Sequence, residues 1–196
     1  MLFTKVLYPV LALFSVSSIA FAKPLPEASV AAVADIEARQ STDVLSTVKN
    51  LQTTVAPIVD QLNQAAATGK SPSALINELQ TAFSGATKTL SGAKKNSLTT
   101  ADVTATISVS LKLFLDVIIV LGKFSFIDVI IDGNVDVFLN AFISILDTTH
   151  PGIAAAIGKG IPSANLVLLI NLRLVAVINI LGLGGLLGGL LGIIGL

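Results

Sequence analysis

The side chains best suited to chemistry are three aspartates near the middle of the second half of the chain. Asp128, Asp132 and Asp136 recur every four residues, so a helix would place them along one slowly turning stripe. Paired carboxylates can serve acid–base catalysis or bind a cation. The segment that starts at Asp132 resembles a calcium loop, but it has Val137 where such a loop needs glycine and Ile143 where it needs an acid. We interpret the stripe as a solvated face of an apolar helix, with no metal bound.

His150 is the only histidine of the chain and stands directly before Pro151 and Gly152. A Ser–His–Asp site would need a nucleophile motif such as Gly-x-Ser-x-Gly, and a zinc site would need further His or Cys ligands. The sequence contains neither the motif nor any cysteine. We therefore interpret His150 as a turn residue and expect a non-enzymatic protein without a cofactor.

The composition describes one domain that is unusually apolar. The 196 residues are 53% hydrophobic and 12% charged, whereas soluble domains are about a quarter charged. The net charge of zero gives no attraction to nucleic acid, so we expect no nucleic-acid partner. Because there is no cysteine, a disulfide framework is excluded.

Residues 1–22 have the pattern of a secretory signal peptide. Lys5 precedes a short apolar run, and Ala20, Phe21 and Ala22 form a small-x-small cleavage site. We predict cleavage after Ala22 and secretion. Residues 23–39 are predicted to be a propeptide or linker, because they are punctuated by proline and rich in small and acidic residues. Their end, Arg39 before Gln40, resembles fungal processing sites cut after a single arginine; an uncleaved linker is the alternative.

Residues 40–100 are predicted to be a polar region of amphipathic helices. A first helix from Ser41 or Thr42 would end at Thr68 and Gly69, with a kink caused by Pro57. Its apolar positions follow heptad spacing: Val44, Val48, Leu51, Val55, Ile58 and Leu62. A second helix would start near Ser71 and present another apolar row: Leu75, Leu79, Phe83, Ala86 and Leu90.

Residues 101–196 are predicted to be a hydrophobic helical region. Thr99 and Asp102 form a capping pattern for a third helix that runs through Leu121, and residues 111–121 are apolar on nearly every face. A further helical segment over 122–147, with a break near Gly133, is preferred to strands because polar side chains recur every four residues. A short helix over 153–157 follows the turn at His150.

The last stretch, residues 163–196, carries one charge, Arg173. Residues 174–194 are long enough to span a bilayer, but no Lys or Arg follows them and no polar spacer precedes them. We therefore interpret the stretch as the exposed end of a hydrophobic half, ordered by an apolar partner. The predicted interface residues are Leu111, Phe114, Leu183, Leu186, Leu187, Leu190 and Leu191.

The predicted fold is all-α, an amphipathic helical bundle with a hydrophobic C-terminal half and a Gly/Leu-rich tail. The whole layout resembles small secreted, cysteine-free hydrophobic proteins of cell walls and aerial hyphae in mushroom-forming fungi. Residues 41–95 also resemble fungal hydrophobic-surface-binding proteins. These resemblances imply a structural, surface-active protein of the cell wall or extracellular matrix. Its expected partners are hydrophobic surfaces or wall material, other copies of the chain, and lipid or membrane. A membrane-embedded helical protein of the secretory pathway is the alternative.

Overall fold

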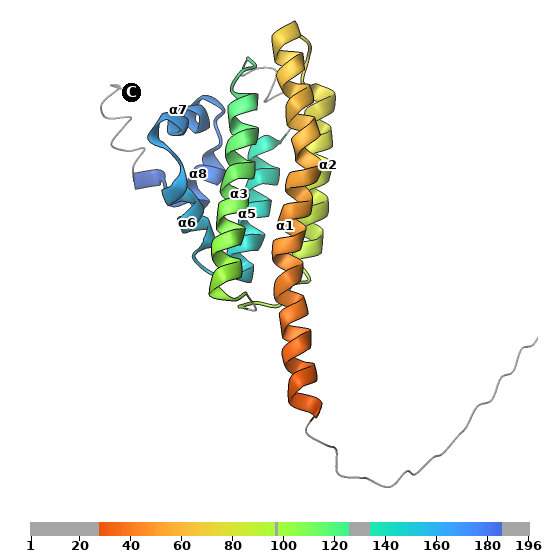
Figure 1. Cartoon of the computed structure of the whole chain (residues 1–196). Helices are drawn as coiled ribbons and strands as arrows, with labels where there is room; N and C mark the ends of the chain where they lie inside the picture. The colour runs from red at the N-terminus through yellow and green to blue at the C-terminus, as the bar shows by residue number, and fades with distance from the viewer. Residues whose placement is uncertain (1–27, 97, 126–133, 186–196) are drawn as a thin grey trace, which may run out of the picture.

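The computed structural model describes residues 28–96, 98–125 and 134–185, with side chains described from residue 44 onward (Figure 1). Within these residues the chain forms helices and no strand, which confirms the all-α fold class. The helices are α1 (Ala28–Thr68), α2 (Ser73–Leu90), α3 (Thr100–Leu121), α5 (Val135–Thr149), α6 (Ile153–Gly160), α7 (Ser163–Asn171) and α8 (Val175–Ile180). The predicted signal peptide, Asp128 and Asp132 lie outside the described residues.

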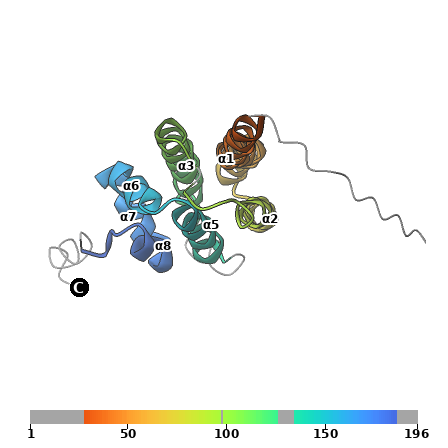
Figure 2. The same ribbon diagram turned by 90° about the horizontal axis from the view of Figure 1, so that it is seen from below.

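The helices stack in three layers, which Figure 2 shows end-on. The antiparallel pair α1 and α2 forms the first layer, and α3 and α5 form the middle one. The short helices α6, α7 and α8, here called the C-terminal layer, form the third. Helix α1 packs against α3 and α2 packs against α5, while α6 and α7 pack against α3 and α8 packs against α5. The middle helices are therefore covered on two sides.

Helix α1 confirms the predicted heptad seam, because all six of its seam residues from Val44 to Leu62 are buried. Its start is different from the prediction. The helix begins at Ala28, so the segment expected to be a propeptide or linker is largely helical, and Arg39 lies within α1. The physical reason is composition, since residues 28–40 contain no Gly or Pro and are rich in alanine. The first turns of α1 project beyond the other helices (Figure 1).

Helix α2 carries the aromatic centre of the core. Ile76, Leu79, Phe83, Ala86 and Leu90 are buried, which adds Ile76 to the predicted row and leaves Leu75 only partly buried. The ring of Phe83 lies 5.3 Å from the rings of both Phe138 and Phe142 on α5, and it meets Phe142 edge-on. This aromatic group joins the first layer to the middle one.

The N-terminus of α3 has the predicted cap. The Thr99 Oγ1 accepts a hydrogen bond of 3.2 Å from the backbone N–H of Asp102, and it donates one of 2.7 Å to Asp102 Oδ2. The Asp102 carboxylate also lies in the first turn, where the helix dipole favours a negative charge. Both groups therefore stabilise the point at which the chain enters the middle layer.

We expect the substitution Thr99→Ala to lower the free energy of unfolding by about 1 kcal/mol, the usual cost of losing an N-cap. Chemical denaturation followed by circular dichroism measures this change. Thr100→Ala is the matched control, because Thr100 is exposed and begins the helix without being its cap. Equal stability of the two variants would show that the Thr99 hydroxyl does not cap α3.

Helix α3 is apolar nearly all round because it is the shared wall between two layers. Among the described helices it alone is long and apolar enough to cross a membrane, with a mean hydropathy of 2.0 in its most apolar window, of which 39% is buried inside the fold. Helices α6 and α7 pass the same test only as a pair, and they meet at a bend of 107°. Packing on both sides buries part of this apolar surface, whereas Ile119 stays 42% exposed.

The described part of the C-terminal stretch, residues 163–185, forms two short helices and not the continuous helix that a membrane span would require. Helix α7 ends at Asn171, and Arg173 adopts a left-handed conformation with φ of 50°. The N–H of Leu174 then donates to Leu169 O and that of Arg173 to Ile170 O, which is the Schellman arrangement of a helix end. Helix α8 stops in the same way at Gly182, whose φ is 70°.

These two stops decide where the apolar side chains of the stretch go. In each motif the residue after the left-handed position, Leu174 or Leu183, is buried. Burial of that residue against the preceding turn is the usual companion of a Schellman stop. The chain is thereby divided into short helices that fold back over α3 and α5, and much of the stretch becomes core.

Candidate functional site

Two carboxylates of α5 hold the C-terminal layer in place. Asp136 accepts hydrogen bonds of 2.9 Å at both of its carboxylate oxygens, from the backbone N–H of Ala176 and from that of Val177. These two N–H groups belong to the first turn of α8, where helical donors have no intrahelical partner. Asp136 therefore serves as a cap supplied by another helix, and the predicted role as part of a solvated stripe is wrong for this residue.

Asp147 performs the same task at the other end of α5. Its Oδ1 accepts from the N–H of Gly152 at 2.9 Å and from that of Ala154 at 3.1 Å, at the start of α6. About three helical turns separate Asp136 from Asp147, so both carboxylates lie on one face of α5. Sequence reasoning missed both caps. The donors to Asp136 lie forty residues further along the chain, in α8, so no local signal identifies them. The donors to Asp147 are only five and seven residues away, at the start of α6.

His150 and its neighbours form the corner between α5 and α6. The backbone N–H of His150 donates to Leu146 O at 3.0 Å, and Gly152 has φ of 98°, which favours glycine. The turn predicted at this histidine is confirmed. Together with Asp147, this corner sets the direction in which α6 leaves α5.

Three glycines allow the C-terminal layer to approach its supports closely. A Cβ at Gly158 would lie 2.3 Å from the backbone oxygen of Leu181, so α6 and the end of α8 touch through their backbones. A Cβ at Gly160 would lie 2.5 Å from Leu111 Cδ2 on α3, and one at Gly122 would lie 2.8 Å from Leu168 Cδ2 on α7. The layer is therefore closely packed against α3 as well as tied to α5.

The structure separates the predicted interface residues into three groups. Phe114 and Leu183 are buried in the core, so they do not face an external partner in this fold. Leu111 is half-buried, with its side chain against Gly160. Leu186, Leu187, Leu190 and Leu191 lie outside the described residues, as does Ala22 of the predicted cleavage site.

The large hydrophobic side chains that are exposed among the described residues all lie in the second half of the chain. They are Ile119 on α3, Val137 on α5, Val167 on α7 and Val175 on α8, with exposures between 42% and 62%. Val137 follows Asp136 in the sequence, and Val175 precedes Ala176, whose N–H binds the Asp136 carboxylate. These hydrogen bonds bring the start of α5 to the start of α8. The exposed large apolar side chains thus lie on the C-terminal layer and on α3 and α5, the two helices against which it packs.

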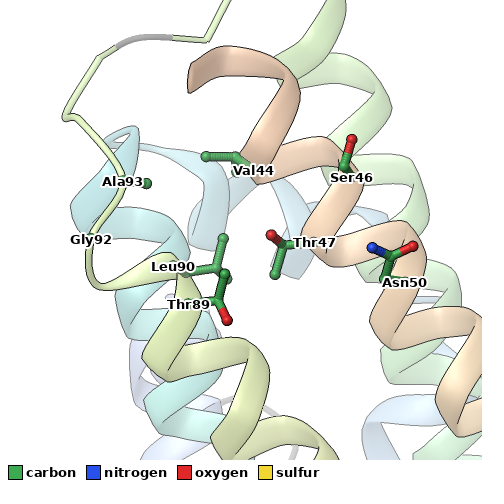
Figure 3. Close-up of a pocket in the computed structure, with 8 residues that line it drawn as sticks. All are labelled: Val44, Ser46, Thr47, Asn50, Thr89, Leu90, Gly92 and Ala93. Atoms are coloured by element: carbon green, nitrogen blue, oxygen red, sulfur yellow. The ribbon is translucent and has the colours of Figure 1, made fainter. Parts of the chain in front are cut away.

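The opposite side of the molecule has a polar groove between α1 and the end of α2 (Figure 3). The groove has a volume of about 470 Å³ and is lined by Val44, Ser46, Thr47, Asn50, Thr89, Leu90, Gly92 and Ala93. The Thr89 hydroxyl donates to Gly85 O within its own helix. Because these lining side chains are hydroxyl, amide and aliphatic groups, none of them titrates near neutral pH. The side chains that line this groove therefore include no acid–base pair that could catalyse a proton transfer.

A second groove, of about 630 Å³, runs between α1 and α3 and is lined in part by charged side chains. Asp60, Lys112 and Asp116 line it, and the Lys112 Nζ lies 2.8 Å from Asp116 Oδ2. Nearby, the Lys123 Nζ donates to Asn63 Oδ1 at 2.7 Å and joins the two helices. These are exposed pairs, which keep the α1–α3 side hydrated and contribute little to stability.

Comparison of the chain with protein-family models, with curated proteins and with solved structures finds no match.

Proposed function

We propose that this chain is a secreted, non-enzymatic, surface-active protein of the cell wall or extracellular matrix. Its C-terminal half covers hydrophobic interfaces and associates with other copies, while α1 and α2 face water. The observation that carries the proposal is the distribution of exposed large hydrophobic side chains. Among the described residues these side chains occur on α3, α5, α7 and α8, and α1 and α2 expose polar side chains.

The sequence after the C-terminal layer supports the same proposal. Residues 186–196 read LLGGLLGIIGL and contain no charged or polar side chain. They continue directly from Gly185, at the end of the layer that already exposes apolar side chains. Exposed large apolar side chains mark surfaces that bind other apolar matter. The chain therefore exposes polar side chains on α1 and α2 and large apolar ones on α3, α5, α7 and α8. Residues 186–196, here called the tail, follow these helices in the sequence and are entirely apolar.

We expect the tail to supply most of the adsorption, because each fully buried Leu or Ile side chain contributes about 1.5–3 kcal/mol. The experiment compares the chain starting at Lys23 with the same chain ending at Gly185, on an alkylated sensor that records adsorbed mass. The cut lies after Leu183 because α8 and Leu183 are part of the core. The shortened chain should keep its helical circular dichroism and adsorb at least about tenfold less.

A full-length control variant separates the loss of apolar surface from the loss of length. The substitutions Leu186→Ser, Leu187→Ser, Leu190→Ser and Leu191→Ser should reduce adsorption as the truncation does. Adsorption of the shortened chain at the full-length level would contradict the proposal.

The second candidate is a membrane-embedded helical protein of the secretory pathway, which the length and hydropathy of α3 favour. Alkaline carbonate extraction of membranes distinguishes the two candidates. A surface-active secreted protein is released into the supernatant, whereas a protein that spans the bilayer stays in the membrane pellet.

A further inference from the structure

We propose that residues 163–185, here called the flap, swing away from α3, α5 and α6 when the protein meets an apolar surface. The flap comprises α7, α8 and the turns after them. The inference rests on the proposed function, since it describes how the C-terminal half presents its apolar side chains.

The burial pattern shows why opening matters for surface activity. Most large apolar side chains of the flap point inward in this fold, and only Val167 and Val175 are exposed. The buried ones are Leu166, Leu169, Leu172, Leu174, Val177, Ile178, Leu181 and Leu183. An external apolar surface can replace the apolar faces of α3 and α5 as their partner only if the flap separates from these helices.

The joint between α6 and α7 is the hinge. The two helices meet at 107° across Ile161 and Pro162, so the chain already changes direction there. Helix α6 stays behind because its two ends are anchored. Asp147 caps its start, and Gly160 at its end is packed against Leu111 of α3.

Asp136 is the latch. Its carboxylate accepts from both Ala176 and Val177, forty residues further along the chain, and so ties the start of α8 to the start of α5. Hydrogen bonds to a charged acceptor are stronger than neutral ones. Nearby apolar contacts, such as Gly122 with Leu168, can be exchanged for contacts with an external apolar surface, whereas these two hydrogen bonds cannot.

The test uses the cysteine-free background of the chain to lock the flap. The pair Gly122→Cys and Leu168→Cys joins the end of α3 to α7. The native side chain at 168 lies 2.8 Å from the site of a Cβ at 122, and the shorter cysteine removes that clash. Adsorption rates on an alkylated sensor are measured for this protein oxidised and reduced. The oxidised form should adsorb about tenfold more slowly, because the disulfide prevents the flap from opening. The factor corresponds to the free energy of about one hydrogen bond to a charged group, such as those that Asp136 accepts.

Variants of the latch should act in the opposite direction. Asp136→Ala should adsorb about tenfold faster than the unmodified chain. Asp136→Asn keeps one acceptor oxygen, so its adsorption rate should lie between those of Asp136→Ala and the unmodified chain. The matched control is Asp60→Ala, which removes an exposed carboxylate from α1. Its adsorption rate should not change.

A combined variant distinguishes flap opening from general unfolding. Asp136→Ala with the oxidised lock should adsorb as slowly as the lock alone; if it stays fast, the flap is not the moving part and the inference is overturned. Equal rates for oxidised and reduced forms of the lock alone also overturn it. If the unmodified chain does not adsorb at all, the proposed function fails, and the flap with it.

Discussion

Replacing Gly158 with alanine is expected to destabilise the protein by about 2–4 kcal/mol. The added Cβ would lie 2.3 Å from the backbone oxygen of Leu181 and 3.2 Å from its Cβ. Both obstacles belong to the backbone or are attached directly to it, so no side-chain rotation relieves the clash. Either α6 or the end of α8 must shift, and the packing of Leu181 and Leu183 in the core is lost. The midpoint of chemical denaturation, followed by circular dichroism, measures the loss.

The control is the same substitution at Gly85, inside α2. A Cβ at Gly85 meets nothing within 4 Å, and the residue is exposed. Gly85→Ala should therefore stabilise the protein by about 0.5–1 kcal/mol, because alanine loses less backbone entropy in a helix. Opposite signs for the two substitutions are the expected result. A Gly158→Ala variant as stable as the unmodified protein would mean that α6 and α8 are not in contact.

The substitution Phe83→Ala is expected to cost about 3–5 kcal/mol of unfolding free energy. The Phe83 side chain is 1% exposed, and its ring packs against both Phe138 and Phe142 at 5.3 Å. Its removal leaves a cavity between α2 and α5, and it also removes two aromatic contacts that contribute beyond buried area. Because Phe83 links the first layer to the middle one, thermal and chemical unfolding should both shift.

Val137→Ala provides the comparison on the partner helix. Val137 is 62% exposed, so truncating it should change the stability by no more than about 0.5 kcal/mol. A small effect at Phe83, of the same size as at Val137, would show that α2 does not pack against α5 through its aromatic ring.

The first two helices and the start of the third follow closely from the sequence. The seam from Val44 to Leu62 repeats at heptad spacing, and every one of its residues is buried in the structure. The Thr99 cap could also be predicted, because its partner Asp102 stands three residues away. In both cases the interacting groups belong to one helix, so the repeat of the helix itself relates sequence to position.

The beginning of α1 shows how local signals can mislead. Pro24, Pro26 and the acidic residues suggested a propeptide or linker up to Arg39, with the helix expected from Ser41 or Thr42, but the helix starts at Ala28. Only the prolines interrupt a helix, and both precede its first residue. The alanine-rich segment after them favours helix without any tertiary contact.

The C-terminal stretch shows what hydropathy cannot resolve. Its composition suits a bilayer, a partner or a core equally well, because all three accept apolar side chains. The described part is divided by left-handed residues at Arg173 and Gly182. The glycine was a recognisable stop, whereas an arginine in that conformation gives no signal in the sequence. Burial of Leu174 and Leu183 then assigns much of the stretch to the core.

By itself, the sequence determined the all-α class, the buried seam of α1, the cap of α3 and the turn at His150. Each depends on residues within a few positions of one another, where helix geometry alone relates sequence to structure. Only the tertiary structure decided what Asp136 does. Asp136 lies forty residues from its partners, and it meets them because α8 folds back onto α5. Asp136, the one described member of the three aspartates that first suggested chemistry, instead caps α8 and ties it to α5.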